Sequence, residues 1–346
     1  MREIQIDLAA LKANVQYLKT KAERPILAVV KADAYGHGLI PCAKAAIEAG
    51  ADWLGTALLE EALTLREAGV TAPILAWLLP PGENYRRAVE QNIDLGVSSL
   101  AAFDEINAIA GARIHLEIET GMGRGGFADE WPELLTRDLS QVVGIFTHLA
   151  RADEPEQPQN QSQIAKFNQM VGQLNELGIT PIRHLANTAA TLSNSEAKFD
   201  LVRIGIAMYG LSPLGSDNNL KPVMKVRAKL VLVKELPAGH PIGYGATEST
   251  TENTKIGIVA MGYADGIPRN AKGAGVTFQS QSAPIIGRVS MDQFAVDLGP
   301  GSEAKSGDWV TVVGDNYDAY AWAKACQTIH YEITTRMGSR ITRVNK

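Results

Sequence analysis

The sequence has few of the residues that define several protein classes. Only two of its 346 residues are cysteines, Cys42 and Cys326, which lie far apart in helix-like contexts. They suit a reducing compartment and predict neither a disulfide framework nor a zinc site. The motifs GxSxG, HExxH and CxxC do not occur, so no serine, cysteine or metal-dependent hydrolase constellation is present. We expect no bound metal.

Long apolar runs and blocks of like charge are also missing. No apolar run approaches the length of a membrane span, and residues 1–15 lack the long apolar core and cleavage site of a signal peptide. The net charge of -5 is modest, which argues against nucleic acid or an anionic membrane surface as the main partner. We therefore expect a cytoplasmic protein that acts on a small molecule.

What the sequence does contain is a regular alternation of short apolar and amphipathic segments. Eight segments have the character of buried strands: residues 26–30, 51–56, 73–78, 93–98, 113–118, 142–146, 182–186 and 201–206. Most gaps between them hold an amphipathic helical stretch, and several of these end in glycine. Eight strands alternating with helices predict a TIM (β/α)8 barrel. A doubly wound sheet has the same alternation, and the pattern alone does not exclude it.

The character of the sequence changes after Tyr209. Residues 210–222 are rich in turn formers and are typical of a linker. The β-branched segments that follow, broken by Gly, Pro and Asp, predict a mainly antiparallel β domain. They cover residues 228–236, 255–263, 284–298 and 308–313, with one helix expected near 318–328. We therefore place the barrel at residues 1–215 and the β domain at residues 216–346.

Candidate catalytic and binding residues lie in or directly after several strands of the expected barrel: Lys31, Arg124, His148, Thr188 and Arg203. The carboxyl ends of the strands build the active site of a barrel, so we expect these side chains to converge on one rim. A lysine in an apolar, electropositive pocket has a lowered pKa. Its neutral amine is then able to form a Schiff base.

Pyridoxal phosphate needs such a lysine, a cradle for its phosphate and a partner for its ring nitrogen. The main-chain N–H groups of Gly205 and Ile206, with the hydroxyl of Thr188, form a candidate cradle. Tyr35, four residues after Lys31, offers a phenol. The residues therefore suggest pyridoxal phosphate as cofactor.

Eight motifs resemble those of the alanine racemase family and occur in the family's order. They are AVVKADAYGHG, ETGMGRGG, THLARADE, HLANTAATL, DLVRIGIAMYG, GYGATE, MGYADGIPR and IIGRVSMDQFAVDL, and together they span nearly the whole chain. The resemblance implies a barrel that carries pyridoxal phosphate, followed by a β domain. It also implies a head-to-tail homodimer in which the partner's β domain completes each active site.

The implied reaction is racemisation of alanine, either to supply D-alanine for peptidoglycan or to catabolise alanine. We expect some turnover of serine, because an apolar pocket rejects one added hydroxyl poorly. By the same resemblance, Lys31 is the Schiff-base residue and Arg203 faces the pyridine nitrogen. The residues implied at the cofactor phosphate are Tyr35, Thr188, Gly205 and Ile206.

The resemblance also implies two acid–base groups on opposite faces of the substrate α-carbon. Lys31 would serve the D-face. Tyr263, in the motif GYADG, would serve the L-face and come from the other subunit. His148 and His184 would link Tyr263 and Arg203 by hydrogen bonds. Arginine has only donors, so Arg203 would leave the ring nitrogen unprotonated and suppress side reactions such as transamination.

Substrate binding is implied for Arg124 and for the main-chain N–H of Met291, which would hold the carboxylate. Two positions depart from the family pattern. Glu117 stands where many members have a carbamylated lysine, and we hypothesise that its own negative charge orients Arg124. Ser339 stands where some relatives have a tyrosine near the C-terminus.

Two other functions remain open at this point. GMGRGG matches G-x-G-x-x-G after a strand, which is also found in dinucleotide-binding oxidoreductases, although no second βαβ unit with a ribose-binding acid follows. The other is a barrel that only carries pyridoxal phosphate, as in cofactor-homeostasis proteins of similar fold. Those proteins lack a second domain.

Overall fold

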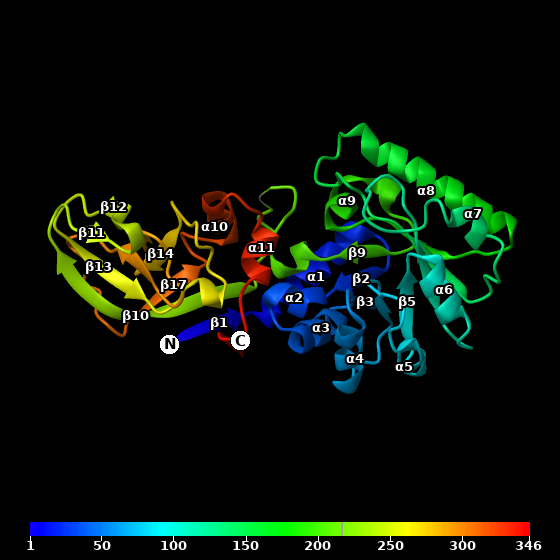
Figure 1. The fold of residues 1–346 in the computed structure, drawn as a ribbon, viewed down its shortest axis with the longest axis horizontal. Helices are drawn as coiled ribbons and strands as arrows, with labels where there is room; N and C mark the ends of the chain where they lie inside the picture. Colours follow the sequence, from blue (N-terminus) through cyan, green and yellow to red (C-terminus); the bar gives the residue numbers. More distant parts are fainter. Residues whose placement is uncertain (216) are drawn as a thin grey trace. The chain divides into compact units, whose positions relative to one another are not determined.

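The computed structural model describes residues 1–215 and 217–346. The chain forms two compact units (Figure 1). The barrel unit comprises Ala10–Ala34 and Leu39–Lys221, and the β unit comprises Met1–Ala9, Tyr35–Gly38 and Pro222–Lys346. The domain boundary expected at 215/216 falls at residue 216, which lies outside the described residues.

The strands of the barrel unit form one sheet in the order β8-β7-β6-β5-β4-β3-β2-β9, and every neighbouring pair is parallel. Their bounds are β2 (Ile26–Val29), β3 (Trp53–Thr56), β4 (Ile74–Ala76), β5 (Ile93–Val97), β6 (Ile114–Glu117), β7 (Val142–Phe146), β8 (Ile182–His184) and β9 (Val202–Ile204). The N–H of Arg203 donates to the carbonyl of Ala186 (2.9 Å) and joins β9 to the chain after β8. The (β/α)8 prediction is confirmed, and the doubly wound alternative is wrong.

Helices fill the connections between these strands. They are α1 (Leu8–Ala22), α2 (Lys31–Gly36), α3 (Leu39–Glu48), α4 (Leu59–Glu67), α5 (Tyr85–Glu90), α6 (Leu100–Asn107), α7 (Trp131–Leu134), α8 (Pro158–Glu176) and α9 (Thr188–Ser193). Side chains of Asn84, Ser99 and Asn187 accept main-chain N–H groups and begin α5, α6 and α9. Figure 1 shows α3, α4 and α6 on the outside of the strands.

The β unit is built on a mostly antiparallel sheet in the order β15-β14-β17-β10-β1-β18, with β13 joining β10 to β16. The long strand β10 (Met224–Leu236) is its centre. The other strands of this sheet are β1 (Arg2–Ile6), β13 (Thr254–Val259), β14 (Gly275–Phe278), β15 (Gln281–Pro284), β16 (Phe294–Asp297), β17 (Trp309–Val313) and β18 (Thr342–Asn345). Strands β11 (Pro241–Ile242) and β12 (Glu248–Ser249) pair with each other in a separate antiparallel ribbon. The predicted antiparallel β domain is therefore present.

Two short segments of early sequence belong to the β unit. Strand β1 pairs antiparallel with β10 and parallel with β18, and its Ile4 and Ile6 side chains are completely buried. Gly36, in the segment Tyr35–Gly38, accepts a hydrogen bond at its carbonyl from Nε of Arg343 (3.0 Å). These pairings join residues more than 200 positions apart, so local sequence patterns give no sign of them.

The C-terminal part has more structure than the single helix expected near residues 318–328. Helix α10 (Ala319–Cys326) lies there, and a second helix, α11 (His330–Thr335), and strand β18 follow it. Among the described residues, no helix combines the length and apolar character that a membrane crossing requires.

Candidate active site

Lys31 lies where β2 ends and is the first residue of α2. The N–H of the next residue, Ala32, donates to Oε1 of Glu61 (2.6 Å), which anchors this turn to the start of α4. Residues 32–35 all have φ near +54°, so the turn is left-handed. Non-glycine residues adopt this conformation at a cost of roughly 1–2 kcal/mol each. The backbone after Lys31 is therefore strained and held by its surroundings.

The Lys31 amine lies in a cationic and partly apolar environment. Its Nζ atom is 5.7 Å from the centre of the Trp77 ring. Burial lowers the pKa of Lys31, and the charges of Arg124 and Arg203 lower it further, against an opposing effect of Glu61. This is the electropositive pocket that the sequence predicts, and it favours the neutral amine.

Arg203, on β9, is 7% exposed and its guanidinium is held from several sides. Nη1 donates to the carbonyl (2.6 Å) and to Nδ1 (3.2 Å) of His184. Nη2 donates to the carbonyls of Thr147 (2.7 Å) and Leu185 (3.2 Å) and to Nδ1 of His148 (3.2 Å). The Nε–H has no acceptor within the part of the chain that the structure describes, so one donor of a fixed guanidinium remains available.

A chain of buried side chains continues from Arg203 across the barrel. Because arginine only donates, Nδ1 of His184 must accept, and its protonated Nε2 then donates to Nδ1 of His115 (2.8 Å). Nε2 of His115 in turn donates to Oδ2 of Asp94 (3.1 Å), whose Oδ1 accepts from Arg113 (2.9 Å). Because Arg203 can only donate, the tautomers of His184 and His115 are both fixed. Sequence reasoning missed His115 and Asp94.

The two histidines beside Arg203 are neutral at physiological pH. Burial, together with the charges of Arg203, Arg124 and Lys31, lowers the pKa of His148 to about 3. Burial also holds the pKa of His184 well below its usual value, with His115 and Arg203 acting in the same direction. Arg203 itself stays charged, although burial lowers its pKa to about 10. The guanidinium is therefore the permanent cation of this cluster.

Thr188, Gly205 and Ile206 lie together at the opening of the barrel. Oγ1 of Thr188 accepts the N–H of Gly205 (2.9 Å). Ile206 begins a one-turn helix, so its N–H precedes the helix's own hydrogen bonds. Thr188 is the first residue of α9, and the N-cap is Asn187, whose side chain accepts the N–H of Ala190 (3.0 Å). The three groups proposed as a phosphate cradle are thus neighbours.

Glu117 ends β6, and the substrate arginine expected at Arg124 follows in the next loop. Burial raises the pKa of Glu117, whereas Arg124 and Arg203 lower it, so the two cations act on this carboxylate electrostatically. Within the described residues, no hydrogen bond or ion pair joins Glu117 to Arg124. The hypothesis that Glu117 orients Arg124 therefore stays a prediction.

The glycine-rich loop after β6 holds one of the chain's own carboxylates. The N–H groups of Gly121 and Met122 donate to Oε1 of Glu119, the second at 2.7 Å. Those of Gly123 (2.9 Å) and Arg124 (3.4 Å) donate to Oε2. In a dinucleotide-binding loop these N–H groups would face a pyrophosphate. The Glu119 carboxylate fills that position here, which argues against the oxidoreductase alternative.

In the β unit, Tyr263 and Met291 are fixed beside each other by their main chains. The N–H of Tyr263 donates to the carbonyl of Ser290 (3.1 Å), and that of Ala264 to the carbonyl of Met291 (3.0 Å). A Cβ at Gly262 would lie 2.3 Å from the Met291 carbonyl oxygen, so only glycine permits this approach. The N–H of Met291 itself has no acceptor among the described residues and is free to bind a ligand.

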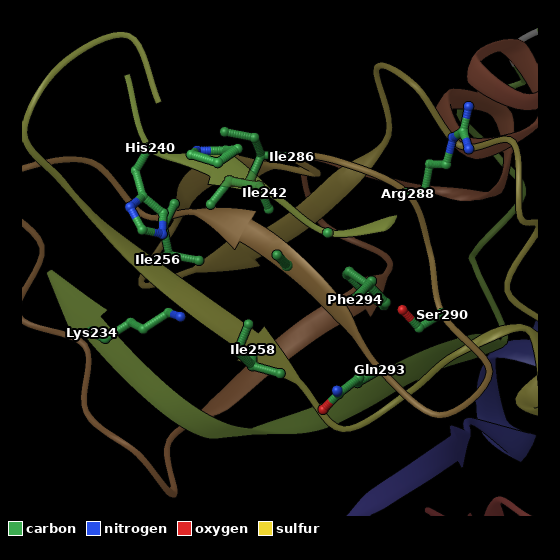
Figure 2. A pocket seen from close by; sticks show the side chains of 13 residues that line it. Lys234, His240, Ile242, Ile256, Ile258, Ile286, Arg288, Ser290, Gln293 and Phe294 are labelled. Carbon is green, nitrogen blue, oxygen red and sulfur yellow. The ribbon is translucent and has the colours of Figure 1, made fainter. Parts of the chain in front are cut away.

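A second tyrosine of the β unit, Tyr244, lies near Met291. Both residues line one hollow of the β unit, together with Gly243, Ser290, Asp292 and Gln293. Tyr244 is 69% exposed and Tyr263 is 40% exposed. The adjoining pocket, of roughly 160 Å³, has isoleucine walls, and Figure 2 shows Lys234 and His240 at one end and Ser290 and Gln293 at the other. Sequence reasoning quoted GYGATE but assigned no role to its tyrosine.

Tyr35 is also in the β unit, where its ring lies 6.3 Å from that of Tyr331. Burial raises the pKa of Tyr35 above its usual value, so its phenol stays protonated. Some relatives have a tyrosine near the C-terminus where this chain has Ser339. Tyr331, at the start of α11, is a nearby tyrosine to which the sequence analysis gave no role.

A (β/α)8 barrel with a lysine amine among cations at the carboxyl ends of its strands is the framework of a barrel enzyme. The alanine racemase N-terminal domain model matches residues 6–213, and the alanine racemase C-terminal domain model matches residues 223–345. The chain belongs to the alanine racemase family, and it is therefore an amino-acid racemase.

Individual relatives agree over the full length of the chain. The alanine racemase of Salinispora tropica is 45% identical, with 97% of this chain and 96% of the relative covered. The crystal structure of the enzyme from D-cycloserine-producing Streptomyces lavendulae superposes with a TM-score of 0.97 at 44% identity, covering 100% and 97% of the two chains. The alanine racemase of Bartonella henselae, solved with covalently bound pyridoxal phosphate, has a TM-score of 0.91 at 28% identity, covering 100% and 99%.

Proposed function

We propose that this protein interconverts L-alanine and D-alanine with pyridoxal phosphate as cofactor. The arrangement of Lys31 and Arg203 carries the proposal, because it supplies an amine of lowered pKa beside a fixed, donor-only cation. The alternative of a barrel that only carries the cofactor is disfavoured by the β domain, which such proteins lack.

The residues of the barrel unit fit the cofactor. The free Nε–H of Arg203 suits a pyridine nitrogen that accepts a hydrogen bond, and Lys31 would hold the cofactor covalently. Thr188, Gly205 and Ile206 would bind its phosphate. The family resemblance adds Tyr35, which belongs to the β unit, as a further donor. When bound, pyridoxal phosphate supplies an electron sink that acidifies the α-carbon of the amino acid. Because Arg203 cannot accept a proton, the ring nitrogen would stay unprotonated and side reactions would be limited.

Racemisation then needs a proton to leave one face of the α-carbon and another to arrive at the opposite face. Lys31 would accept and return the proton on the D-face, where its lowered pKa favours the neutral amine that accepts. A tyrosine of the partner subunit's β domain would serve the L-face. His148, neutral and bonded through Nδ1 to Arg203, would extend the network toward that tyrosine with its Nε2–H, and His184 would support Arg203 from the other side.

Tyr263 is the proposed second base, as the sequence predicts. It is 40% exposed in the single chain, so another surface is able to reach its phenol. Hydrogen bonds from the N–H groups of Tyr263 and Ala264 fix its backbone beside Ser290 and Met291, and the Met291 N–H is the expected ligand of the substrate carboxylate. Tyr244 lines a hollow with Met291 and would lie at the edge of the same site.

The substrate carboxylate would be held by Arg124 and by the N–H of Met291, with Glu117 setting the Arg124 side chain through its charge. These groups specify an α-amino acid. Alanine is the substrate named for the relatives. Slow turnover of serine is expected, since one added hydroxyl is poorly rejected.

The decisive experiment incubates the purified protein, loaded with pyridoxal phosphate, with each alanine enantiomer in deuterated water. Conversion to the racemate with deuterium at the α-carbon supports the proposal. Retained configuration without deuterium uptake by either enantiomer overturns it. The same assay with serine measures the second substrate.

We also propose that the protein is a cytoplasmic homodimer that supplies D-alanine for peptidoglycan or catabolises alanine.

A further inference from the structure

The loop that carries Arg124 is organised around the side chain of Glu119. Four consecutive N–H groups, of residues 121 to 124, point at its two carboxylate oxygens. Two of them reach Oε1 and two reach Oε2, so both oxygens are in use. A carboxylate that accepts several main-chain N–H groups holds its loop strongly, because each bond involves a charged acceptor.

Helix α8 braces the same loop from outside. Nε2 of Gln159 donates to the carbonyl of Gly121 (2.8 Å). Nε2 of Gln163, which is 1% exposed, donates to Oγ1 of Thr120 (3.0 Å) and to the carbonyl of His148 (2.9 Å). Gln163 thus ties the loop to the segment that carries His148. The position of the Arg124 backbone is therefore set jointly with the network around Arg203.

The two carboxylates at the end of β6 have different surroundings. The oxygens of Glu119 are occupied by the loop, whereas no hydrogen bond to the Glu117 carboxylate occurs among the described residues. The Glu117 carboxylate is thus able to attract the Arg124 guanidinium by its charge, whereas the Glu119 carboxylate accepts a hydrogen bond from the Arg124 main-chain N–H.

We propose that Glu119 is a positioning residue that closes the loop of residues 121–124 and so places Arg124 to bind the substrate carboxylate. The inference deepens the proposed function and rests on it, because it takes alanine as the ligand of Arg124. It predicts that Glu119 determines how tightly substrate binds and leaves the proton-transfer steps largely unchanged.

The test is Glu119→Gln in the holoenzyme. Glutamine has the same length, but it replaces one acceptor oxygen with a donor, which cannot accept the N–H groups of Gly123 and Arg124. We expect the KM for both alanine enantiomers to rise about tenfold while kcat changes less than about twofold. Hydrogen exchange of a peptide covering residues 121–126 should become faster in the variant, with or without substrate.

The control is Glu133→Gln, which removes an exposed carboxylate that pairs with Arg137, and it should change neither the KM nor the hydrogen exchange. A second variant, Gln159→Ala, removes one brace of the loop and should shift KM and exchange in the same direction by less. Unchanged exchange in Glu119→Gln overturns the proposal. A raised KM with unchanged exchange also overturns it, since Glu119 would then act on the substrate by charge alone.

The two readouts separate this inference from the proposed function. If the wild-type protein does not racemise alanine, the proposed function fails, yet the exchange measurement still shows whether Glu119 holds the loop. If the wild-type protein is active and Glu119→Gln matches it in KM, only the role of Glu119 is lost.

Discussion

The candidate catalytic groups of the barrel unit are buried and hydrogen-bonded within one chain, whereas those of the β unit are exposed. In the barrel unit, the side chains of Arg203, His184, His115 and Asp94 are at most 7% exposed and joined by hydrogen bonds. In the β unit, Tyr244, Tyr263 and Met291 are 40–69% exposed. In the barrel unit, hydrogen bonds within the chain compensate for the burial of these polar groups. In the β unit, the three side chains are open to solvent in the single chain.

This difference separates two ways of preparing an active site. A buried, hydrogen-bonded cluster fixes protonation states before any ligand arrives, because burial and neighbouring charge act in the folded chain itself. An exposed tyrosine acquires a defined environment only when another surface covers it. The barrel unit should therefore control cofactor chemistry in each chain. The β unit should matter only in an assembled dimer.

The largest expected effect is in the barrel unit, at Lys31. Lys31→Ala removes the amine proposed to hold the cofactor and to carry the D-face proton, so the rate should fall by about ten-thousandfold or more. The visible absorbance that remains after exhaustive dialysis should also disappear. Lys44→Ala, an exposed lysine on α3, is the matched control and should keep both. A dialysis-resistant chromophore in Lys31→Ala would assign the attachment to another lysine.

The next effect distinguishes the two exposed tyrosines of the β unit. Tyr263→Phe should slow racemisation by about a thousandfold, because the L-face loses its proton carrier. In deuterated water, this variant should still exchange the α-proton of D-alanine through Lys31, without inversion, but not that of L-alanine. Tyr244→Phe should lose about tenfold or less and affect both enantiomers alike. The reverse result would assign the second base to Tyr244.

The active sites shared between subunits, which the proposed dimer implies, have their own test. Lys31→Ala and Tyr263→Phe proteins, each inactive alone, should regain activity when their subunits are exchanged. Random exchange pairs half of the subunits as mixed dimers, each with one intact site, so recovery should approach about a quarter of the wild-type rate. If each chain builds its whole site, mixing will restore nothing. Tyr244→Phe mixed with Lys31→Ala serves as the control for subunit exchange.

The sequence predicted the barrel unit well because its signals are local. Eight apolar segments alternate with amphipathic helices, and a barrel places the residues after its strands on one face. Lys31, His148 and Arg203 could therefore be grouped from their positions alone. Asp94 and His115 could not, because single polar residues inside buried strands look like any core residue until a facing strand supplies the partner.

The β unit was predicted only in outline because its arrangement depends on distant pairings. Strand β1 joins it by pairing with β10 and β18, and no periodicity near residue 4 indicates this. Tyr244 and Tyr263 both stand in glycine-rich turns, GYGATE and MGYADG. Both are exposed, and their positions beside residues 290 and 291 depend on packing of which the sequence carries no local mark.

A smaller effect tests the buried cluster of the barrel unit through Asp94, which is 3% exposed. Asp94→Asn replaces a carboxylate that accepts from both His115 and Arg113 with a neutral amide. The free energy of unfolding should fall by about 2 kcal/mol, as measured by urea denaturation. Asp104→Asn, at an exposed pair with Arg137, should cost less than about 0.5 kcal/mol. Equal losses would show that burial adds nothing to the Asp94 contacts.

The smallest effect is the pH dependence of stability that His148 confers on the barrel unit. Its pKa of about 3 in the folded chain lies below the ordinary value of 6.5, so the folded state resists the proton that the unfolded state accepts. Its contribution is therefore complete above pH 6.5 and is lost progressively as the pH falls from 6.5 toward 3. Between pH 7 and pH 5 the wild-type protein should lose about 1–2 kcal/mol more unfolding free energy than His148→Gln. His184 remains in both proteins, so the difference isolates His148, and identical pH profiles would mean that His148 protonates freely in the folded chain.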